Sequence, residues 1–495
     1  APTAGDDAAT VNQTESVIIP VLDNDDDADG DQLNVASVTS ASNGTVNINS
    51  DNTITYTPDP TFSGADNFTY TVSDGNGGSD AASVNVAVNA ISPPSNSADS
   101  YVAIANGGGT KHNLEHNNSS KSFYHDGVWW AVLPSNGVWS VFEASGTPSS
   151  AGATGGWNIA SDPLLNSNLH ADIAWNATTN TLYVLQFGSN SSQPHLLEMS
   201  YDSNNRSWTA DKNVNLSASL DSEVWGSNND LSLGLDQNGN VLILGITGGN
   251  SNERGLHLAY STSSDLSTWD HITVDNDTTS SGGGNGNSKA DFIHFSVNGN
   301  DQVGIVYSKD GASSNSWSFA WRDSSQNSTD YSNGWSIETI TTDVKIDDHV
   351  SVATDGEYIY AAIKDNKDDI WLLKGQPGNW DDPVHVVDSG SPSRPIIAYD
   401  ETSDQIYILY QEKQSPYGDI YMKATDAANP AFDLNGLGTV ILEGTSSGDR
   451  FLDPQGPAHA VGADTGDDFI VFAKNSNTSE IWYNDVTLPS DLWFV

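Results

Sequence analysis

A strand–turn–strand phrase recurs along most of this sequence and constrains its fold more than any other feature. In each copy a polar residue leads an apolar run, a turn rich in Gly, Asn and Asp follows, and a second apolar run ends the phrase. Five clear copies span residues 170–185, 229–244, 290–307, 348–363 and 393–409, and two weaker copies span residues 120–133 and 457–472.

An aromatic residue placed before the last strand of each unit gives a second register. Both registers count seven units, and convincing helical periodicity is almost absent beyond residue 100. A four-stranded unit cannot bury both of its faces alone, so we predict an all-β fold in which residues 101–495 form a seven-bladed β-propeller. Residues 101–105 or the C-terminal LWFV would close the ring. The aromatic register consists of Trp157, Trp208, Trp269, Trp335, Trp380, Phe432 and Trp493.

The first ninety residues predict a separate β-sandwich. Their apolar and polar residues alternate in short segments that are separated by Gly, Asp, Asn and Pro, a pattern typical of antiparallel strands. Residues 91–100 are rich in Pro and Ser and are expected to form a linker. The predicted domains are therefore residues 1–90 and 101–495. The sandwich segments are 16–22, 32–41, 44–50, 53–59, 67–74 and 82–90.

An acidic loop, DNDDDADGD at residues 23–31, connects the first two of these strands. Carboxylate oxygens are the ligands that calcium prefers, so we expect structural calcium here, although the loop could also be a solvated turn. This loop, the phrase TYTPDPTFSGADNFTYTVSDGNGG and a last VNVAV strand together resemble the bacterial cadherin-like repeat of the VCBS type, over residues 2–90. The resemblance implies an immunoglobulin-like, calcium-binding spacer or adhesion module. The expected ligands are Asp25, Asp27, Asp29 and Asp31.

The phrase AYSTSSDLSTWD at residues 259–270 resembles a degenerate Asp-box, the turn of BNR-type repeats in sialidase-like propellers. Ser267 stands where that pattern has Gly, and YSKDGASSNSW at residues 307–317 is a fainter match. Asp-boxes are structural turns, so the resemblance implies a propeller superfamily and no particular activity. Two further phrases, at residues 353–366 and 393–412, resemble BNR repeats of secreted carbohydrate-active proteins.

The charge of the chain limits its partners. Lys and Arg number 17 against 65 Asp and Glu, which gives a formal net charge of −48 at pH 7. Such a surface repels nucleic acid and anionic membranes, and no apolar stretch approaches the ~18 residues that span a bilayer. The absence of Cys excludes disulfides and thiolate metal sites. From this charge we expect no nucleic acid partner and no membrane insertion. The resemblances above imply a secreted or cell-surface bacterial protein that binds a polysaccharide or other glycan.

The first strand of each propeller blade lines the central channel, so the polar residue that leads it is the place to look for chemistry. Cations and His are scarce in this chain, and their concentration near this hub predicts a pocket for an acidic ligand. Hub residues could instead bond one another and trapped water. The repeats align Ser119 or Ser120, Asp172, Asp230, Asp291, His349, Arg394 and Gln455 at the hub, with His116, His170, Trp225, Lys345 and Asp348 just upstream.

Three reactions need different residues at such a hub. A sialidase needs an arginine triad, and Arg394 is the only arginine in hub register. A glycoside hydrolase needs two carboxylates, which the trio Asp172, Asp230 and Asp291 could supply, although the same trio could hold a metal. A polysaccharide lyase needs a cation for the uronate carboxylate, a base and an acid.

We expect a polysaccharide lyase that cleaves acidic, uronate-containing chains by β-elimination. Seven-bladed propeller lyases of ulvan-type polysaccharides use a similar set of His, Tyr and Arg. A non-catalytic glycan-binding adhesin and a glycoside hydrolase are the alternatives. In the lyase interpretation Arg394 and Lys345 hold the carboxylate. His170, His349 and His116 move protons, and Tyr124 is a further acid. Trp225 stacks on a sugar ring, and the substrate is also contacted by Asp172, Asp230 and Asp291.

Overall fold

Strands make up nearly all the regular structure in the computed structural model, and no α-helix occurs among the residues it describes. None of these residues therefore forms a helix that could cross a membrane. The chain divides into two units, residues 1–93 with 425–433 and residues 94–424 with 434–495. The structure describes residues 1–12, 16–59, 62, 64–89, 95–96, 122–135, 138–144, 157–164, 170–187, 194–216, 231–236, 238–247, 254–277, 290–297, 300–309, 316–323, 331–344, 349–388, 390–401, 403–412, 418–434, 436–443, 451–455, 468–475 and 481–487.

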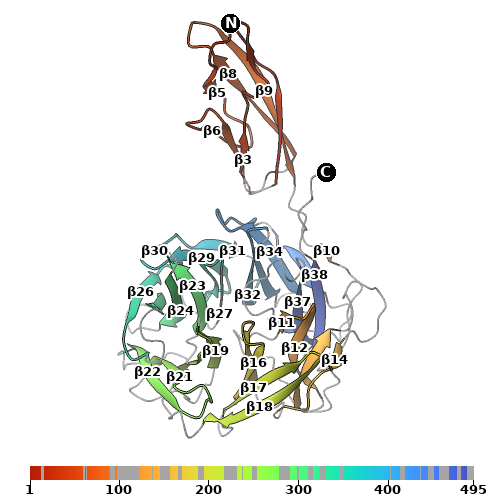
Figure 1. The fold of residues 1–495 in the computed structure, drawn as a ribbon, viewed down its shortest axis with the longest axis vertical. Helices are drawn as coiled ribbons and strands as arrows, with labels where there is room; N and C mark the ends of the chain where they lie inside the picture. Colours follow the sequence, from red (N-terminus) through yellow and green to blue (C-terminus); the bar gives the residue numbers. More distant parts are fainter. Residues whose placement is uncertain are drawn as a thin grey trace. The chain divides into compact units, whose positions relative to one another are not determined.

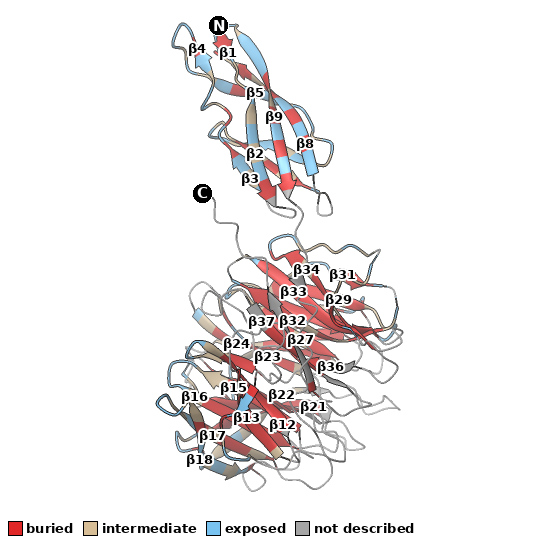
Figure 2. Ribbon diagram, turned by 90° about the vertical axis from the view of Figure 1, so that its right-hand side faces the viewer, coloured by how far each residue is buried: buried red, intermediate tan, exposed pale blue. Residues whose placement is uncertain are grey.

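The N-terminal unit is an immunoglobulin-like β-sandwich. One sheet has the strand order β2-β9-β8-β5, the other has the order β3-β7-β6, and a short pair β1-β4 lies beside them. Side chains alternate between buried and exposed along β8, as expected for strands with one face on a core (Figure 2). The strands are β1 (Pro2–Thr3), β2 (Asp7–Asn12), β3 (Val17–Ile19), β4 (Asp26–Asp27), β5 (Asn34–Val38), β6 (Gly44–Ile48), β7 (Ile54–Pro58), β8 (Gly64–Ser73) and β9 (Ser79–Asn89).

Seven sheets of the second unit form a β-propeller, as the two sequence registers predicted (Figure 1). Inner strands of successive sheets, such as β23, β27 and β32, contact one another around the centre. Blades 1 to 3 contain β11 (Ser122–His125), β12 (Val128–Ser135), β13 (Val138–Ala144) and β14 (Trp157–Ile159); β15 (His170–Asn176), β16 (Thr181–Phe187), β17 (His195–Asp202) and β18 (Ser207–Asn215); and β19 (Leu231–Leu235), β20 (Val241–Thr247), β21 (Arg254–Ser261) and β22 (Trp269–Asp277).

The remaining blades follow the same plan from the inside outward. Blades 4 to 6 contain β23 (Ala290–Val297), β24 (Asn300–Lys309), β25 (Ser316–Asp323) and β26 (Trp335–Thr341); β27 (Val350–Thr354), β28 (Ile359–Lys364), β29 (Ile370–Gln376), β30 (Asn379–Trp380) and the added β31 (Val384–Val387); and β32 (Pro392–Asp400), β33 (Gln405–Glu412), β34 (Ile420–Asp426) and β35 (Thr439–Leu442). Blade 7 contains β36 (Phe451–Gln455), β37 (Asp468–Asn475), β38 (Ile481–Thr487) and β10 (Ser95–Asn96).

The ring closes through β10, which pairs antiparallel with β38 and completes blade 7. Ser95 lies opposite Thr487, so two residues of the expected linker act as the outer strand of the last blade. The segments that we expected to close the ring, residues 101–105 and 492–495, lie outside the described residues. Joining the first propeller strand to the last sheet protects an edge that would otherwise be exposed.

The core of the propeller lies between neighbouring blades. Leu182 and Val184 of β16 pack in a cluster with blade 1, whereas Tyr183 and Leu185 of the same strand pack in a cluster with blade 3. Because both faces of such a strand are buried, its sequence is a continuous apolar run with little alternation. Figure 2 shows the propeller strands as largely buried ribbons.

Five of the register aromatics lie within a fourth strand, whereas the sequence pattern placed them just before it. Trp157, Trp269 and Trp335 each begin one, Trp208 is the second residue of β18, and Trp380 ends β30. Trp208 packs between blades 1 and 2, and the Trp157 ring lies 5.4 Å from that of Phe472 in blade 7. Phe432 lies outside any strand, and Trp493 lies outside the described residues.

Candidate functional site

Hub carboxylates join neighbouring blades through their backbones. Asp172 of blade 2 accepts hydrogen bonds from the amide of Ile173 at 2.9 Å and from the amide of Leu233 in blade 3 at 2.7 Å. Asp291 of blade 4 accepts from the amide of Phe292 at 3.0 Å and from that of Val352 in blade 5 at 3.1 Å. Both oxygens of each carboxylate therefore hold strands in place.

Two serines continue this hub ladder. The Ser232 hydroxyl donates to Asp291 at 3.4 Å, and the Ile397 amide of blade 6 donates to the Ser351 hydroxyl of blade 5 at 3.3 Å. Ser232 and Ser351 thus occupy the positions equivalent to Asp172 and Asp291.

The sequence alignment is two residues early in blades 3, 5 and 6. It placed Asp230, His349 and Arg394 in line with Asp172, whereas the hub ladder aligns Ser232, Ser351 and Ile396 with Asp172. Polar residues stand at both positions in blades 3 and 5, whereas the ladder position of blade 6 is Ile396. A shift of two keeps a side chain on the same face of a strand. Hydrophobic pattern alone could not separate the two alignments.

A second level of polar residues lies two positions upstream of the ladder. His170 begins β15 and His349 directly precedes β27, and both are buried. The bond between Ser351 and Ile397 sets β27 beside β32, so His349 and Arg394 lie at the same end of two adjacent inner strands. His170 lies at that end of blade 2.

Arg394 has an unusual backbone conformation. Its φ is 54°, and among the described residues it is the only residue other than Gly with positive φ inside a strand. It also precedes Pro395, and a residue before proline strongly prefers extended backbone. The pairing of β32 with β33 shifts between Ser393 and Ile396, which forms a β-bulge around Arg394. Bulges re-aim side chains and are frequent next to active sites.

The hub carboxyls differ from ordinary surface acids. Burial raises the pKa of Asp291 well above its usual range, and repulsion from Asp172 raises it further. Bonds from the amides of Val352 and Phe292 oppose this effect. A carboxyl that is buried and already bonded on both oxygens is poorly suited to attack or protonate a sugar.

Tyr124, which we expected to act as a further acid, lies at a different level of its blade. Tyr124 stands one residue before the end of β11, next to the turn to β12, and packs edge-on against Trp129 at 5.6 Å. His170, His349 and Arg394 instead lie where their inner strands begin, so the structure separates Tyr124 from them. His116, Trp225, Lys345 and Asp230 lie outside the described residues.

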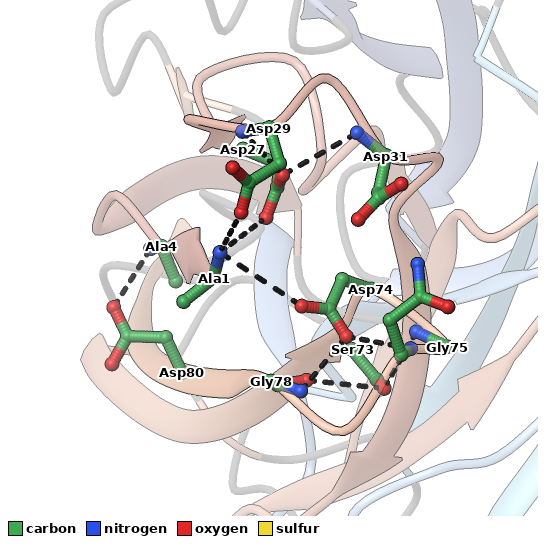
Figure 3. A network of polar contacts seen from close by, with 11 residues as sticks. Ala1, Ala4, Asp27, Asp29, Asp31, Ser73, Asp74, Gly75, Gly78 and Asp80 are labelled. Atoms are coloured by element: carbon green, nitrogen blue, oxygen red, sulfur yellow. Dashed lines mark hydrogen bonds and ion pairs between the residues drawn. The ribbon is translucent and has the colours of Figure 1, made fainter.

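The acidic loop of the N-terminal unit directs two of its carboxylates toward one point (Figure 3). The α-amino nitrogen of Ala1 lies 3.2 Å from Asp27, 3.1 Å from Asp29 and 4.0 Å from Asp74. Asp74 belongs to the SDGNGG turn, and sequence reasoning missed it because it is distant along the chain. Asp31 contributes its backbone amide, which donates to Asp27 at 3.3 Å.

Asp25 faces a different set of partners from the other loop acids. Its carboxylate accepts from the Tyr70 hydroxyl at 2.9 Å and from the Gly5 amide at 2.8 Å. No three acidic or His side chains of the described residues are already arranged as metal ligands. Calcium at the acidic loop stays a prediction. Because Asp25 is engaged by Tyr70 and Gly5 whereas Asp74 lies near Asp27 and Asp29, we add Asp74 to the expected ligands and expect it to contribute more than Asp25.

We expect calcium to raise the unfolding temperature of the N-terminal unit, because a bound cation offsets repulsion among Asp27, Asp29 and Asp74. The Asp74→Asn variant should lose most of this shift, and Asp25→Asn should keep more of it. Calorimetry in calcium and in chelator measures the effect, with magnesium as the ionic-strength control. An equal calcium shift in Asp74→Asn and the wild type would contradict this ligand set.

A ring cluster between blades 1 and 2 was not expected from the sequence. The His125 ring lies 4.7 Å from the rings of Trp175 and Tyr201. Arg206 pairs with Glu143 and lies 3.5 Å from Asp126, which accepts from the Tyr201 hydroxyl at 2.7 Å. The HDG turn at residues 125–127 is the only sequence feature that could have indicated this ring cluster.

Burial lowers the pKa of His125, an effect that Arg206 increases and Asp126 opposes. Below the ordinary His pKa of about 6.5, His125 therefore binds a proton more readily in the unfolded chain than in the folded one. The free energy of unfolding should then fall as the pH drops below that value. In His125→Phe this loss should be smaller. Urea unfolding at neutral and mildly acidic pH measures it, and identical pH dependence in both proteins would exclude His125 as the cause.

Comparisons with known proteins identify part of the chain. Residues 1–87 match the bacterial Ig domain family. No curated protein matches the chain. Similar solved structures include a protein of unknown function from Dyadobacter fermentans, with 11% identity, a TM-score of 0.41 and coverage of 65% of this chain and 95% of that one.

Two further similar structures have named activities. The Hadza microbial sialidase Hz136 shows 11% identity and a TM-score of 0.39 and covers 76% of each chain. The Aleuria aurantia lectin, in complex with α-methyl-L-fucoside, shows 14% identity and a TM-score of 0.39, with coverage of 65% of this chain and 99% of that one. Similarity at this level assigns no activity to the chain, and the family match is confined to the N-terminal unit.

Proposed function

We propose that the propeller is carbohydrate-active and acts on an acidic polysaccharide at the end of the channel where Arg394 and His349 lie. The observation that carries this proposal is the left-handed backbone of Arg394 at the same end of the adjacent inner strand as the buried His349. Strained residues persist only where the surrounding structure holds them, and they cluster at functional sites. In a chain with net charge −48, a retained guanidinium at the hub is suited to a carboxylate, which it can bind through two parallel hydrogen bonds.

The reaction that fits these groups is β-elimination on a uronate sugar. Arg394 would pair with the carboxylate and acidify the adjacent C5 proton, which His349 would accept. The C4–O bond then breaks, the leaving oxygen takes a proton from an acid such as His170, and the product keeps a C4–C5 double bond. The bacterial Ig domain match supports an extracellular setting, where such polymers occur.

Two alternatives use the same hub differently. A non-catalytic adhesin would bind the polymer through Arg394 without cleaving it, and the bacterial Ig domain match favours this reading because such domains suit spacer roles. A glycoside hydrolase would need free carboxylates, and it is disfavoured because backbone amides occupy both oxygens of Asp172 and of Asp291.

This function is tested by incubating the protein with a uronate panel. The panel consists of polymers that contain glucuronate, galacturonate or mannuronate. We expect ultraviolet absorbance from the unsaturated uronate to rise with one member and to vanish in His349→Ala. Retention on the polymer without any rise would support the adhesin. Neither retention nor a rise on the whole panel would overturn the acidic-polysaccharide proposal, and a reducing-sugar signal without absorbance would indicate a hydrolase.

A further inference from the structure

The Arg394 bulge, residues 393–396, is held by a contact on each side. Downstream, the Ile397 amide donates to the Ser351 hydroxyl of the neighbouring blade at 3.3 Å. Upstream, the Ser391 amide donates to the carboxylate of Glu412, at 2.9 Å to one oxygen and 3.1 Å to the other. The strained residue therefore lies between two anchored amides.

The upstream contact leaves no spare room. Glu412 is 2% exposed and lies opposite Pro392 in the β32–β33 pairing. Gly390 has φ of 86°, and a Cβ atom there would lie 2.1 Å from a carboxylate oxygen of Glu412. A Cβ atom at position 390 would therefore displace the Glu412 carboxylate, and the left-handed backbone favours Gly there as well.

The downstream contact differs from its equivalents in the hub ladder. Asp172 and Asp291 use carboxylates to hold the amide of the next blade, at 2.7 and 3.1 Å, whereas Ser351 uses a neutral hydroxyl. A carboxylate at position 351 would add a negative charge to the inner strand next to β32, and such a charge would oppose the approach of an anionic ligand. A hydroxyl holds the strand without adding a charge.

We infer that Ser351 and Glu412 are positioning residues that hold Arg394 in its left-handed conformation for an anionic ligand. This inference rests on the proposed function, since it concerns the same site. Removing either contact should allow the bulge to relax toward extended backbone, which Pro395 favours. The guanidinium of Arg394 would then no longer be aligned with the carboxylate of the ligand, and binding of that carboxylate would weaken. Binding of the neutral parts of the ligand would be unaffected.

The test measures binding of uronate-panel oligosaccharides and of a neutral glucan by calorimetry, with amide hydrogen exchange at Ile397 as a second readout. The Ser351→Ala and Gly390→Ala variants should each weaken uronate binding about fivefold or more, the equivalent of one lost hydrogen bond, and Ser351→Thr should restore it. Ser232→Ala, the matched hub serine of blade 3, should bind as the wild type does. Exchange at Ile397 should rise in Ser351→Ala only.

The outcomes separate the two proposals. If the wild-type protein binds no member of the uronate panel, the proposed function fails. If the wild type binds and both Ser351→Ala and Gly390→Ala bind equally well, the positioning role is overturned while the function stands. Equal losses in Ser351→Ala and Ser232→Ala would also overturn it, because they would reflect general hub stability.

Discussion

Replacing Trp208 with Ala should lower the free energy of unfolding of the propeller by about 3–5 kcal/mol, the range for deleting a large buried aromatic side chain. Trp208 is 2% exposed, and its ring lies between 5.0 and 5.7 Å from those of Phe123, Trp130, Trp175 and Tyr201. These partners come from blades 1 and 2, so the variant opens a cavity between two blades. Equilibrium urea unfolding measures the loss.

Two control variants make the expectation specific. Trp269 occupies the same register but is only half-buried, so Trp269→Ala should cost clearly less. Trp208→Phe should also cost less than Ala, because it keeps much of the ring and removes a buried indole N–H that has no hydrogen-bond partner among the described residues. A loss in Trp269→Ala equal to that in Trp208→Ala would show that burial between blades is not the cause.

The blade architecture could be predicted because two independent patterns repeat. The aromatic residues mark the fourth strands, and the phrase that ends in runs such as TLYVLQF marks the first two strands of a blade. The closing strand could not be predicted in this way. Ser95 and Asn96 contribute only backbone pairing to β38, and backbone pairing leaves no side-chain pattern in the sequence.

The hub was harder to predict than the blades. Hydrophobic alternation defines which face a residue occupies but not its level along the channel, so Asp230 was aligned where Ser232 belongs. The conformation of Arg394 could not be predicted, because the contacts on either side of it, with Ser351 and Glu412, form only after folding. The one local signal, Pro395, favours extended backbone instead. Asp74 was missed for a related reason, because two loops of the sandwich meet only after folding.

Replacing Arg394 with Gly should abolish uronate binding and yet leave the propeller slightly more stable. Relief of the left-handed conformation gains about 1–2 kcal/mol, whereas the extra freedom of Gly in the unfolded chain costs about 0.5–1 kcal/mol. Loss of the guanidinium removes the charged partner of the ligand, a change that typically weakens binding by about 2–5 kcal/mol. Opposite effects on stability and binding are the signature of a strained functional residue.

Arg206→Gly is the matched control for this variant, because Arg206 also has a left-handed backbone, with φ of 48°, but lies in the turn between β17 and β18. It should leave uronate binding unchanged. Calorimetry for binding and urea unfolding for stability measure both variants. Retained binding in Arg394→Gly would remove the hub site, and a loss of stability in that variant would show that contacts of the Arg394 side chain outweigh the relief of its backbone. Strain and binding at one residue are thus tested independently.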